Sequence, residues 1–223
     1  MDEQKAAANR LLHLARPFLD RNDPDSLSEQ LQLHWSPECL KLLLDEKEER
    51  VVETAATCLG LIGDMSAANA LAYLLHHDSP TVIEAAENAL WHLFFRDGGP
   101  LGQAVLYRIS ESIKSQQCEN ATALLTELIR VHPTFAEAYH QRSCAYYFNN
   151  EYTSALRDAR RACELNPLHF AAWTMVAHAH SAMGRFTEAL SAYREALRIH
   201  PNLAGVRATM HEVREKLAPT LVS

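Results

Sequence analysis

Apolar positions along the chain recur at spacings of three and four residues, which is the period of amphipathic α-helices. Near the carboxyl end, one apolar stripe contains Leu203, Val206, Met210, Val213 and Leu217. The same reading predicts helices over residues 4–20, 26–34, 37–45, 50–61, 67–76 and 81–94. Further helices are expected on both sides of short turns at residues 149–150 and 183–185. The pattern therefore predicts an all-α chain built from helix pairs.

Glycine and proline mark one interruption of this helical pattern. Three of the seven glycines and Pro100 fall within residues 97–102. Glycine tolerates positive φ and proline cannot continue a helix, so this segment predicts an exposed connection. We expect an amino-terminal domain over residues 1–97, a linker over 98–102 and a second domain over 103–223.

A regular spacing of prolines runs through the second half of the chain. Pro133, Pro167 and Pro201 are equally spaced, and we call this interval the proline period. A shift by one such period places Ala155 on Ala189. Two antiparallel helices approach closely where side chains are small, so both alanines are expected at helix–helix contacts. Thr134 and Glu137 have the spacing of a capping box at the start of the first full unit.

In these residues the chain resembles the tetratricopeptide repeat, a helix–turn–helix unit of about 34 residues. The resemblance covers two full repeats over residues 136–203, preceded by a degenerate repeat and followed by a capping helix. It departs from the family pattern at Arg142 and Ser143, where the family usually has leucine and glycine.

A second and slightly shorter period appears in the first half. It places Val51–Glu53 on Val82–Glu84 and Leu59 on Leu90. The pattern LLLDEKEERVVETAATCLGLIGD, over residues 42–64, resembles the short HEAT-like repeats also found in phycobilisome lyases. The helix over residues 50–61 is expected to close at Gly60 and Gly63.

The two resemblances together imply an α-α superhelix of HEAT-like helix pairs followed by tetratricopeptide pairs. Such repeats bury their apolar faces against their neighbours and leave long open surfaces. The two arrays could form one continuous right-handed solenoid or two abutting modules.

Charge and composition exclude several classes of protein. Residues 1–97 hold 17 acids and 8 bases, whereas residues 98–223 hold 11 acids and 13 bases. The net charge of −7 repels a phosphate backbone, so nucleic-acid binding is not expected. No apolar run approaches the ~20 residues that span a bilayer. The start, MDEQKAAANR, does not have the pattern of a signal peptide, so a cytoplasmic protein without membrane contact is expected.

Candidate chemistry is sparse. The five cysteines include no C-x-x-C pair and are expected to be free thiols, and the twelve histidines lack a spacing that would converge on a metal. Common nucleotide-binding and hydrolase motifs do not occur. The one candidate nucleophile is Cys144, four residues after His140 on one helix face. We therefore expect no enzyme activity, no cofactor and no metal.

Recognition surfaces are more informative. In tetratricopeptide arrays the first helix of each unit forms the concave face. Transferred by register, this implies a groove for a peptide or protein partner. The residues expected to bind the partner are His140, Cys144, Tyr147, Phe148, Thr174, His178 and Ser181. Tyr147 and Phe148 are expected to be its anchors, although either ring could instead pack between units.

Some family members hold acidic chaperone tails through a clamp of lysine, asparagine and arginine. The corresponding positions here are His140, Cys144, Met175 and Ala171, which supply neither cations nor amides. The convex face instead gathers five arginines among three glutamates and is interpreted as a solvated face. These arginines are Arg157, Arg160, Arg161, Arg194 and Arg198, and the glutamates are Glu164, Glu188 and Glu195.

The sequence therefore predicts a non-catalytic scaffold or adaptor that binds a protein or peptide on the concave face. An alternative is a HEAT-like enzyme or a module that handles a bilin chromophore or nucleic acid. Self-association through the exposed ends of the repeats is a further possibility.

Overall fold

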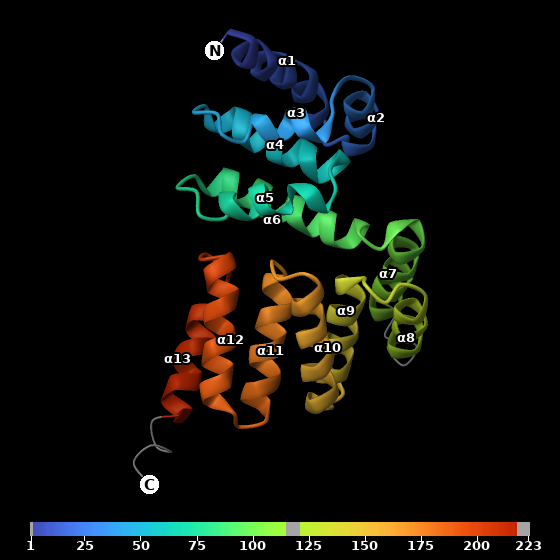
Figure 1. Cartoon of the computed structure of the whole chain (residues 1–223), viewed down its shortest axis with the longest axis vertical. Helices are drawn as coiled ribbons and strands as arrows, with labels where there is room; N and C mark the ends of the chain where they lie inside the picture. Colours follow the sequence, from blue (N-terminus) through green and yellow to red (C-terminus); the bar gives the residue numbers. More distant parts are fainter. Residues whose placement is uncertain (1, 115–120, 218–223) are drawn as a thin grey trace. The chain divides into compact units, whose positions relative to one another are not determined.

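A computed structural model describes residues 2–114 and 121–217, with side-chain surroundings for residues 3–109 and 121–217 (Figure 1). Every regular element within these ranges is helical, which confirms the predicted all-α class. Contacts divide the chain into two compact units, residues 1–93 and 94–223, which we call unit 1 and unit 2.

Unit 1 is a series of helices whose starts follow sequence signals. Pro24 and Pro37 begin α2 and α3, and the side chains of Asp23 and Ser36 accept the cap hydrogen bonds. The elements are α1 (Asp2–Leu19), α2 (Pro24–His34), α3 (Pro37–Leu42), α4 (Glu49–Ile62), the 3-10 turn η1 (Met65–Ala67), α5 (Ala68–Leu74) and α6 (Pro80–Arg96).

Helix α4 passes through Gly60 and ends at Ile62, so the expectation that Gly60 closes this helix is wrong. Gly60 instead lies where α4 meets α6. A Cβ atom added at Gly60 would lie 2.9 Å from the Cα atom of Ala89. The glycine therefore permits a close approach of two helices, while Gly63 follows the helix end.

The segment predicted as a linker is largely helical. Asp97 and Gly98 form a turn, and α7 (Gly99–Lys114) begins directly after it. Gly98 and Gly102 are buried against the ring of Phe135, which leaves no room for a side chain at either position. The boundary between the two units lies four residues before the predicted domain end, inside α6. Separate folding of the predicted domains stays a prediction.

Unit 2 consists of consecutive helices that pack against one another in chain order (Figure 1). After α7 these are α8 (Ala121–Val131), α9 (Ala136–Phe148), α10 (Tyr152–Leu165), α11 (Phe170–Ala182), α12 (Phe186–Ile199) and α13 (Val206–Leu217). The pairs α9/α10 and α11/α12 are the two units of the proline period.

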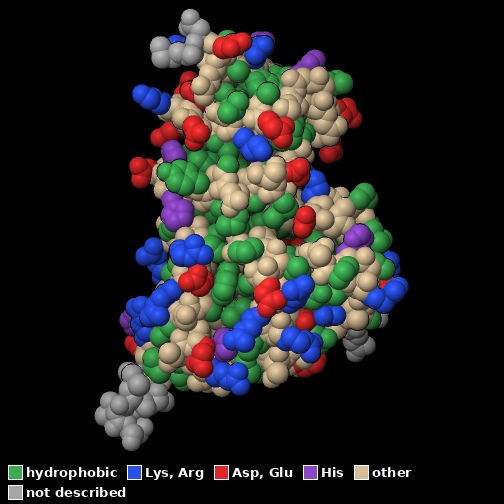
Figure 2. Space-filling model, viewed as in Figure 1, with side chains coloured by type: hydrophobic (Ala, Val, Ile, Leu, Met, Phe, Trp, Pro, Cys, Tyr) green, Lys and Arg blue, Asp and Glu red, His purple; other side chains and the backbone are tan. Residues whose placement is uncertain are grey.

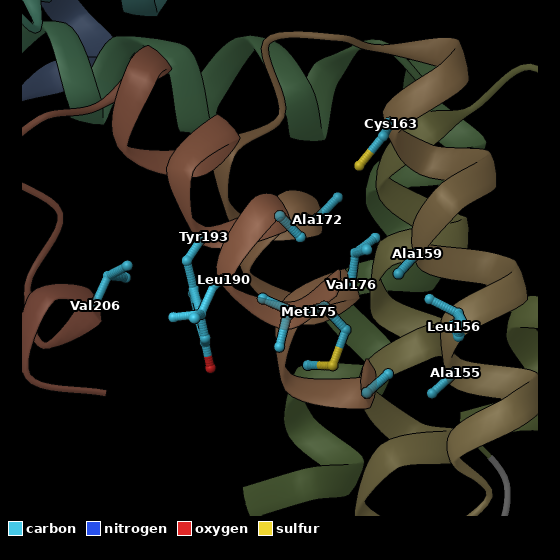
Figure 3. Close-up of a cluster of buried hydrophobic side chains, with 14 of the residues drawn as sticks. Ala155, Leu156, Ala159, Cys163, Ala172, Met175, Val176, Leu190, Tyr193 and Val206 are labelled. Carbon is cyan, nitrogen blue, oxygen red and sulfur yellow. The ribbon is translucent and has the colours of Figure 1, made fainter. Parts of the chain in front are cut away.

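The core between these pairs is rich in alanine. Ala155 and Ala189 are fully buried, as their register predicts, and Ser143 faces the same interior. Figure 3 shows Ala155, Ala159 and Met175 among the side chains that α10 and α11 contribute to this cluster. Small side chains allow close helix packing, so steric fit explains why alanine recurs at matching positions of the two repeats.

The predicted capping box at the start of α9 is wrong. Phe135 occupies the N-cap position and makes no side-chain cap hydrogen bond. Glu137 turns inward and is completely buried, where it accepts hydrogen bonds from Gln141 and His169. A buried partner thus outweighs the local cap that the sequence spacing offers.

Candidate functional site

Four aromatic side chains and one imidazole gather around the end of α9. The ring centroid of Tyr147 lies 6.1 Å from that of Phe148, 5.5 Å from that of Tyr152 and 6.0 Å from that of His178. His178 in turn contacts Tyr193 at 5.5 Å. We call these five residues the aromatic cluster. It joins α9 and α10 of one repeat to α11 and α12 of the next.

Within the aromatic cluster, Phe148 is the one exposed residue. Its side chain is 80% accessible, whereas Tyr147 and His178 are half-buried. Tyr147 therefore packs between repeats, one of the two roles considered for it, and Phe148 remains available for contact. The two predicted anchors differ in their surroundings although they are adjacent in the sequence.

A short hydrogen bond fixes His178. Its Nδ1 atom lies 2.7 Å from the hydroxyl oxygen of Tyr193. Burial lowers the pKa of His178 and raises that of Tyr193, so both groups favour their neutral forms. The pair is thus a neutral polar contact inside the aromatic cluster.

His140 and Cys144 lie close together but do not form an activated pair. The Cys144 Sγ atom is 3.9 Å from Nε2 of His140. Burial lowers the pKa of His140 to about 4 and raises the pKa of Cys144 to about 12. A nucleophilic cysteine needs the thiolate form, which this site disfavours. His140 is also only 7% exposed, so the predicted contact of its ring with a partner has little surface to use.

A buried acid–imidazole pair lies beside His140. His169 Nε2 is 2.8 Å from a carboxylate oxygen of Glu137, and both side chains are fully buried. The His169 Nδ1 atom accepts a hydrogen bond from the backbone N–H of Ala172, which leaves the ring proton on Nε2 to be donated to Glu137. The ring of Phe94 stacks on His169 at 4.8 Å.

Burial alone would raise the pKa of Glu137, but the hydrogen bond from His169 and the nearby imidazoles outweigh burial and hold this pKa below its usual value. Sequence reasoning missed this pair because Glu137 and His169 are 32 residues apart. The one available signal was an acidic residue at an otherwise apolar inner position.

Thr174 and Ser181, also predicted to bind the partner, lie on α11 and are half-buried. The Thr174 hydroxyl donates to the backbone carbonyl of Phe170 within the helix. The structure therefore brings Cys144 to His140 and Tyr147 to Phe148 and His178, while Thr174 and Ser181 share the helix α11 with His178.

The described parts of the chain contain no group of three or more metal-ligating side chains placed to hold an ion. Among the helices of residues 2–114 and 121–217, none is long and apolar enough to cross a membrane.

Comparison with known proteins identifies the repeat type. Residues 140–204 match the family described as tetratricopeptide repeat. Serine/threonine-protein phosphatase 5 of Rattus norvegicus is 32% identical over 93 residues, which is 42% of this chain and 19% of that protein. Small glutamine-rich tetratricopeptide repeat-containing protein 2 of Saccharomyces cerevisiae is 33% identical over 90 residues, or 40% and 26% of the two chains. The matched region thus spans only about a fifth to a quarter of these relatives.

Solved structures agree on the fold. The Sgt2 TPR domain from Aspergillus fumigatus superposes with a TM-score of 0.52 at 17% identity, covering 56% of this chain and 83% of that one. The first TPR of Spaghetti (RPAP3), bound to the HSP90 peptide SRMEEVD, gives a TM-score of 0.50 at 20% identity, covering 52% and 94%. The HEAT-like resemblance of residues 1–97 is not confirmed and stays a prediction. Residues 140–204 match the tetratricopeptide repeat, which agrees with the resemblance expected over residues 136–203.

Proposed function

We propose that the chain is a non-catalytic scaffold that binds a peptide segment of a partner protein on the inner helices α9 and α11. The observation that carries this proposal is the exposed ring of Phe148 beside the half-buried Tyr147. An apolar ring in water gains free energy when a partner covers it. Residues of this kind dominate binding energy where they are held beside a packed surface.

The aromatic cluster supports this role because it is already ordered. Tyr147 is in contact with Phe148, Tyr152 and His178, so little side-chain freedom is left to lose on binding. Preorganised aromatic side chains offer a large contact area at a low entropic cost. The cluster also joins two repeats, so one ligand can contact both.

The chemistry of the inner helices favours an apolar segment over an acidic tail. A related repeat domain, that of RPAP3, is described as bound to the HSP90 peptide SRMEEVD. In this chain the corresponding clamp positions are His140, Cys144, Met175 and Ala171, which carry no cation. The low pKa of His140 keeps its imidazole neutral at pH 7. We propose a peptide that places an apolar side chain on Phe148.

The test is a selection of displayed peptides on the whole chain, followed by fluorescence anisotropy with the selected peptides. Phe148→Ala should weaken binding about tenfold or more, since exposed anchor residues contribute at least this much. The matched control is Tyr73→Ala, because Tyr73 on α5 is exposed to nearly the same degree, 77% against 80%. The peptide SRMEEVD should bind more weakly than the selected peptides.

Equal affinity of the parent chain and Phe148→Ala would contradict the proposed site. Strong binding of SRMEEVD would contradict the proposed ligand chemistry. Phe148 is exposed, so its replacement should leave helical circular dichroism unchanged. Tyr147→Ala is less suitable as a first test because it also removes packing between repeats.

A further inference from the structure

A second surface is formed by residues of α10, α11 and α12. It is a groove with a volume of about 470 Å³, and helix α11 forms part of its wall. We call it the outer groove. Its lining residues are Arg160, Cys163, Glu164, Trp173, Val176, His180, Glu188, Ser191, Ala192 and Glu195.

The acidic and basic side chains of α10 and α12 differ in whether they line this groove. The five arginines and three glutamates of the predicted solvated face belong to α10 and α12. Figure 2 shows basic and acidic side chains interspersed on one face of the molecule. Of these eight residues, all three glutamates line the groove, but Arg160 is the single arginine that does so. The groove is therefore acidic although the surrounding surface is rich in arginine.

Two of these three carboxylates form ion pairs with arginines that lie outside the groove lining. Glu164 and Glu195 pair with Arg161 and Arg198 at 2.9 and 2.8 Å, in exposed pairs of the i,i+3 type that contribute little. Glu188 has no ion pair among the described residues. Within the described ranges, Glu188 is therefore the lining carboxylate without an ion pair, and the ion pairs of Glu164 and Glu195 are solvent-exposed.

The arginine of the groove is already engaged. A terminal nitrogen of Arg160 lies 3.1 Å from Nε2 of His180. Because a guanidinium can only donate, Nε2 must accept, and the imidazole is held with its proton on Nδ1. His180 is 3% exposed, and its Nδ1 atom has no hydrogen-bond partner in the described parts of the chain. The Arg160 guanidinium is thus held at His180 on the groove wall.

The remaining lining is apolar or small. Trp173 donates its indole N–H to the carbonyl of Pro167, which fixes the ring at the groove. Val176 and Ala192 supply buried aliphatic surface, and Ser191 adds no bulk. Lysine and arginine combine an apolar stem with a charged head. The apolar lining of the groove suits the stem, and its carboxylates suit the head. An indole face also attracts a cation.

We propose that the outer groove binds a basic segment of a partner protein, with a lysine or arginine stem against Trp173 and Val176 and its head beside Glu188. This site is separate from the aromatic cluster, so it does not depend on the function proposed for the inner helices. Charge complementarity sets the choice of ligand, since the lining carries three carboxylates and one arginine that is bound to His180.

The experiment uses two labelled synthetic peptides of equal length, one of alternating leucine and lysine and one of alternating leucine and glutamate. Binding to the whole chain is measured by fluorescence anisotropy, and the contacted helices are identified from backbone amide chemical shifts. The lysine peptide should bind and shift α10 and α12, whereas the glutamate peptide should not. The affinity should fall as salt is added, since exposed charges are screened.

Two variants test the named residues. The double variant Glu188→Gln, Glu195→Gln should weaken binding of the lysine peptide by about fivefold or more. Glu127→Gln is the matched control, because Glu127 pairs with Arg130 three residues away and lies outside the groove. Ser191→Trp should fill the groove and abolish binding, whereas Thr187→Trp, at an exposed position of α12 outside the groove, should not.

No binding of the lysine peptide, or chemical-shift changes confined to α9, would overturn the proposal. Unchanged affinity in both the double glutamine variant and Ser191→Trp would do the same. Since Ser191 is exposed, its variant remains informative if the double variant fails to fold. Phe148→Ala should leave this binding intact, so failure here is distinguishable from failure at the inner helices.

Discussion

Ala189 on α12 belongs to the alanine-rich core of unit 2 and is fully buried. Ala189→Leu should overpack this core and lower the free energy of unfolding by about 1–3 kcal/mol. The measurement is chemical denaturation followed by circular dichroism. Ala182→Leu is the control, because Ala182 lies on the exposed end of the neighbouring helix α11. If both variants unfold at the same denaturant concentration as the parent, Ala189 is not at a tight contact.

His140 makes the stability of unit 2 depend on pH. Its pKa is about 4 in the folded chain and ~6.5 when unfolded, so folding opposes protonation. The neutral form of His140 therefore contributes on the order of 3 kcal/mol to the free energy of unfolding. This stability is fully present above pH ~6.5 and is lost as the pH falls toward 4. His169 and Glu137 are the titratable groups that act on His140, with opposite effects.

His140→Leu should therefore flatten the decline in unfolding free energy between pH 6.5 and 4. Denaturation curves across this range provide the measurement. His211→Leu, which replaces an exposed imidazole on α13, should keep the acid dependence of the parent chain. A decline equally steep in His140→Leu would assign the acid sensitivity to other groups.

At this scale, the sequence predicted the small buried residues but not the polar contacts. The proline period identifies Ala155 and Ala189 because steric fit repeats with the period. The pairing of Glu137 with His169 depends on two helices meeting, which no local pattern encodes. The same holds for Tyr147, since its register position alone did not decide between ligand contact and packing between repeats.

Among the helices, α4 and α6 approach each other closely at Gly60. Gly60→Ala should destabilise unit 1 by about 1 kcal/mol or more, even though alanine is the better helix former. The reason is that the new Cβ atom would lie 2.9 Å from backbone of α6 at Ala89. Thermal and chemical unfolding of the whole chain would measure the change.

Asn88→Ala, at an exposed position of α6, provides the comparison, since it adds helix propensity without a clash. It should be neutral or slightly stabilising. A stabilising effect of Gly60→Ala would mean that the helices separate freely at this point.

Most helices were predicted to within a few residues, because proline and cap signals are local. The helix predicted over residues 37–45 begins at Pro37, and the helix predicted over residues 81–94 begins at Pro80. The errors occur where a glycine or an acid serves a distant neighbour. Gly60 was interpreted as a helix end and Glu137 as part of a cap, yet each packs against another element. Gly98 and Gly102, placed in the predicted linker, likewise pack against Phe135.

For the molecule as a whole, the last residues of α6 decide where the chain can be cut to give a stable fragment of unit 2. Phe94 is buried and contacts His169 and Phe170, and Phe95 packs on the core that contains Leu125. A fragment of residues 98–223 lacks both rings, whereas a fragment of residues 90–223 keeps them. The longer fragment should therefore have the higher melting temperature.

Phe94→Ala in the full chain tests the same contact. The substitution should lower the free energy of unfolding by about 3–5 kcal/mol, because it removes a buried ring. Equal melting temperatures of the two fragments would show that unit 2 does not need these residues, and that the predicted boundary after residue 97 is the better one. Calorimetry of both fragments would decide the matter.

The buried pair of Glu137 and His169 also restricts how the number of repeats can change. One proline period further along, the matching positions hold Ala171 and Leu203. A deletion of one period that joins the middle of the first repeat to the middle of the second would leave Glu137 facing leucine. A buried carboxylate without its partner costs several kcal/mol. Gain or loss of repeats by recombination is therefore tolerated only at breakpoints that keep the acid and the imidazole together.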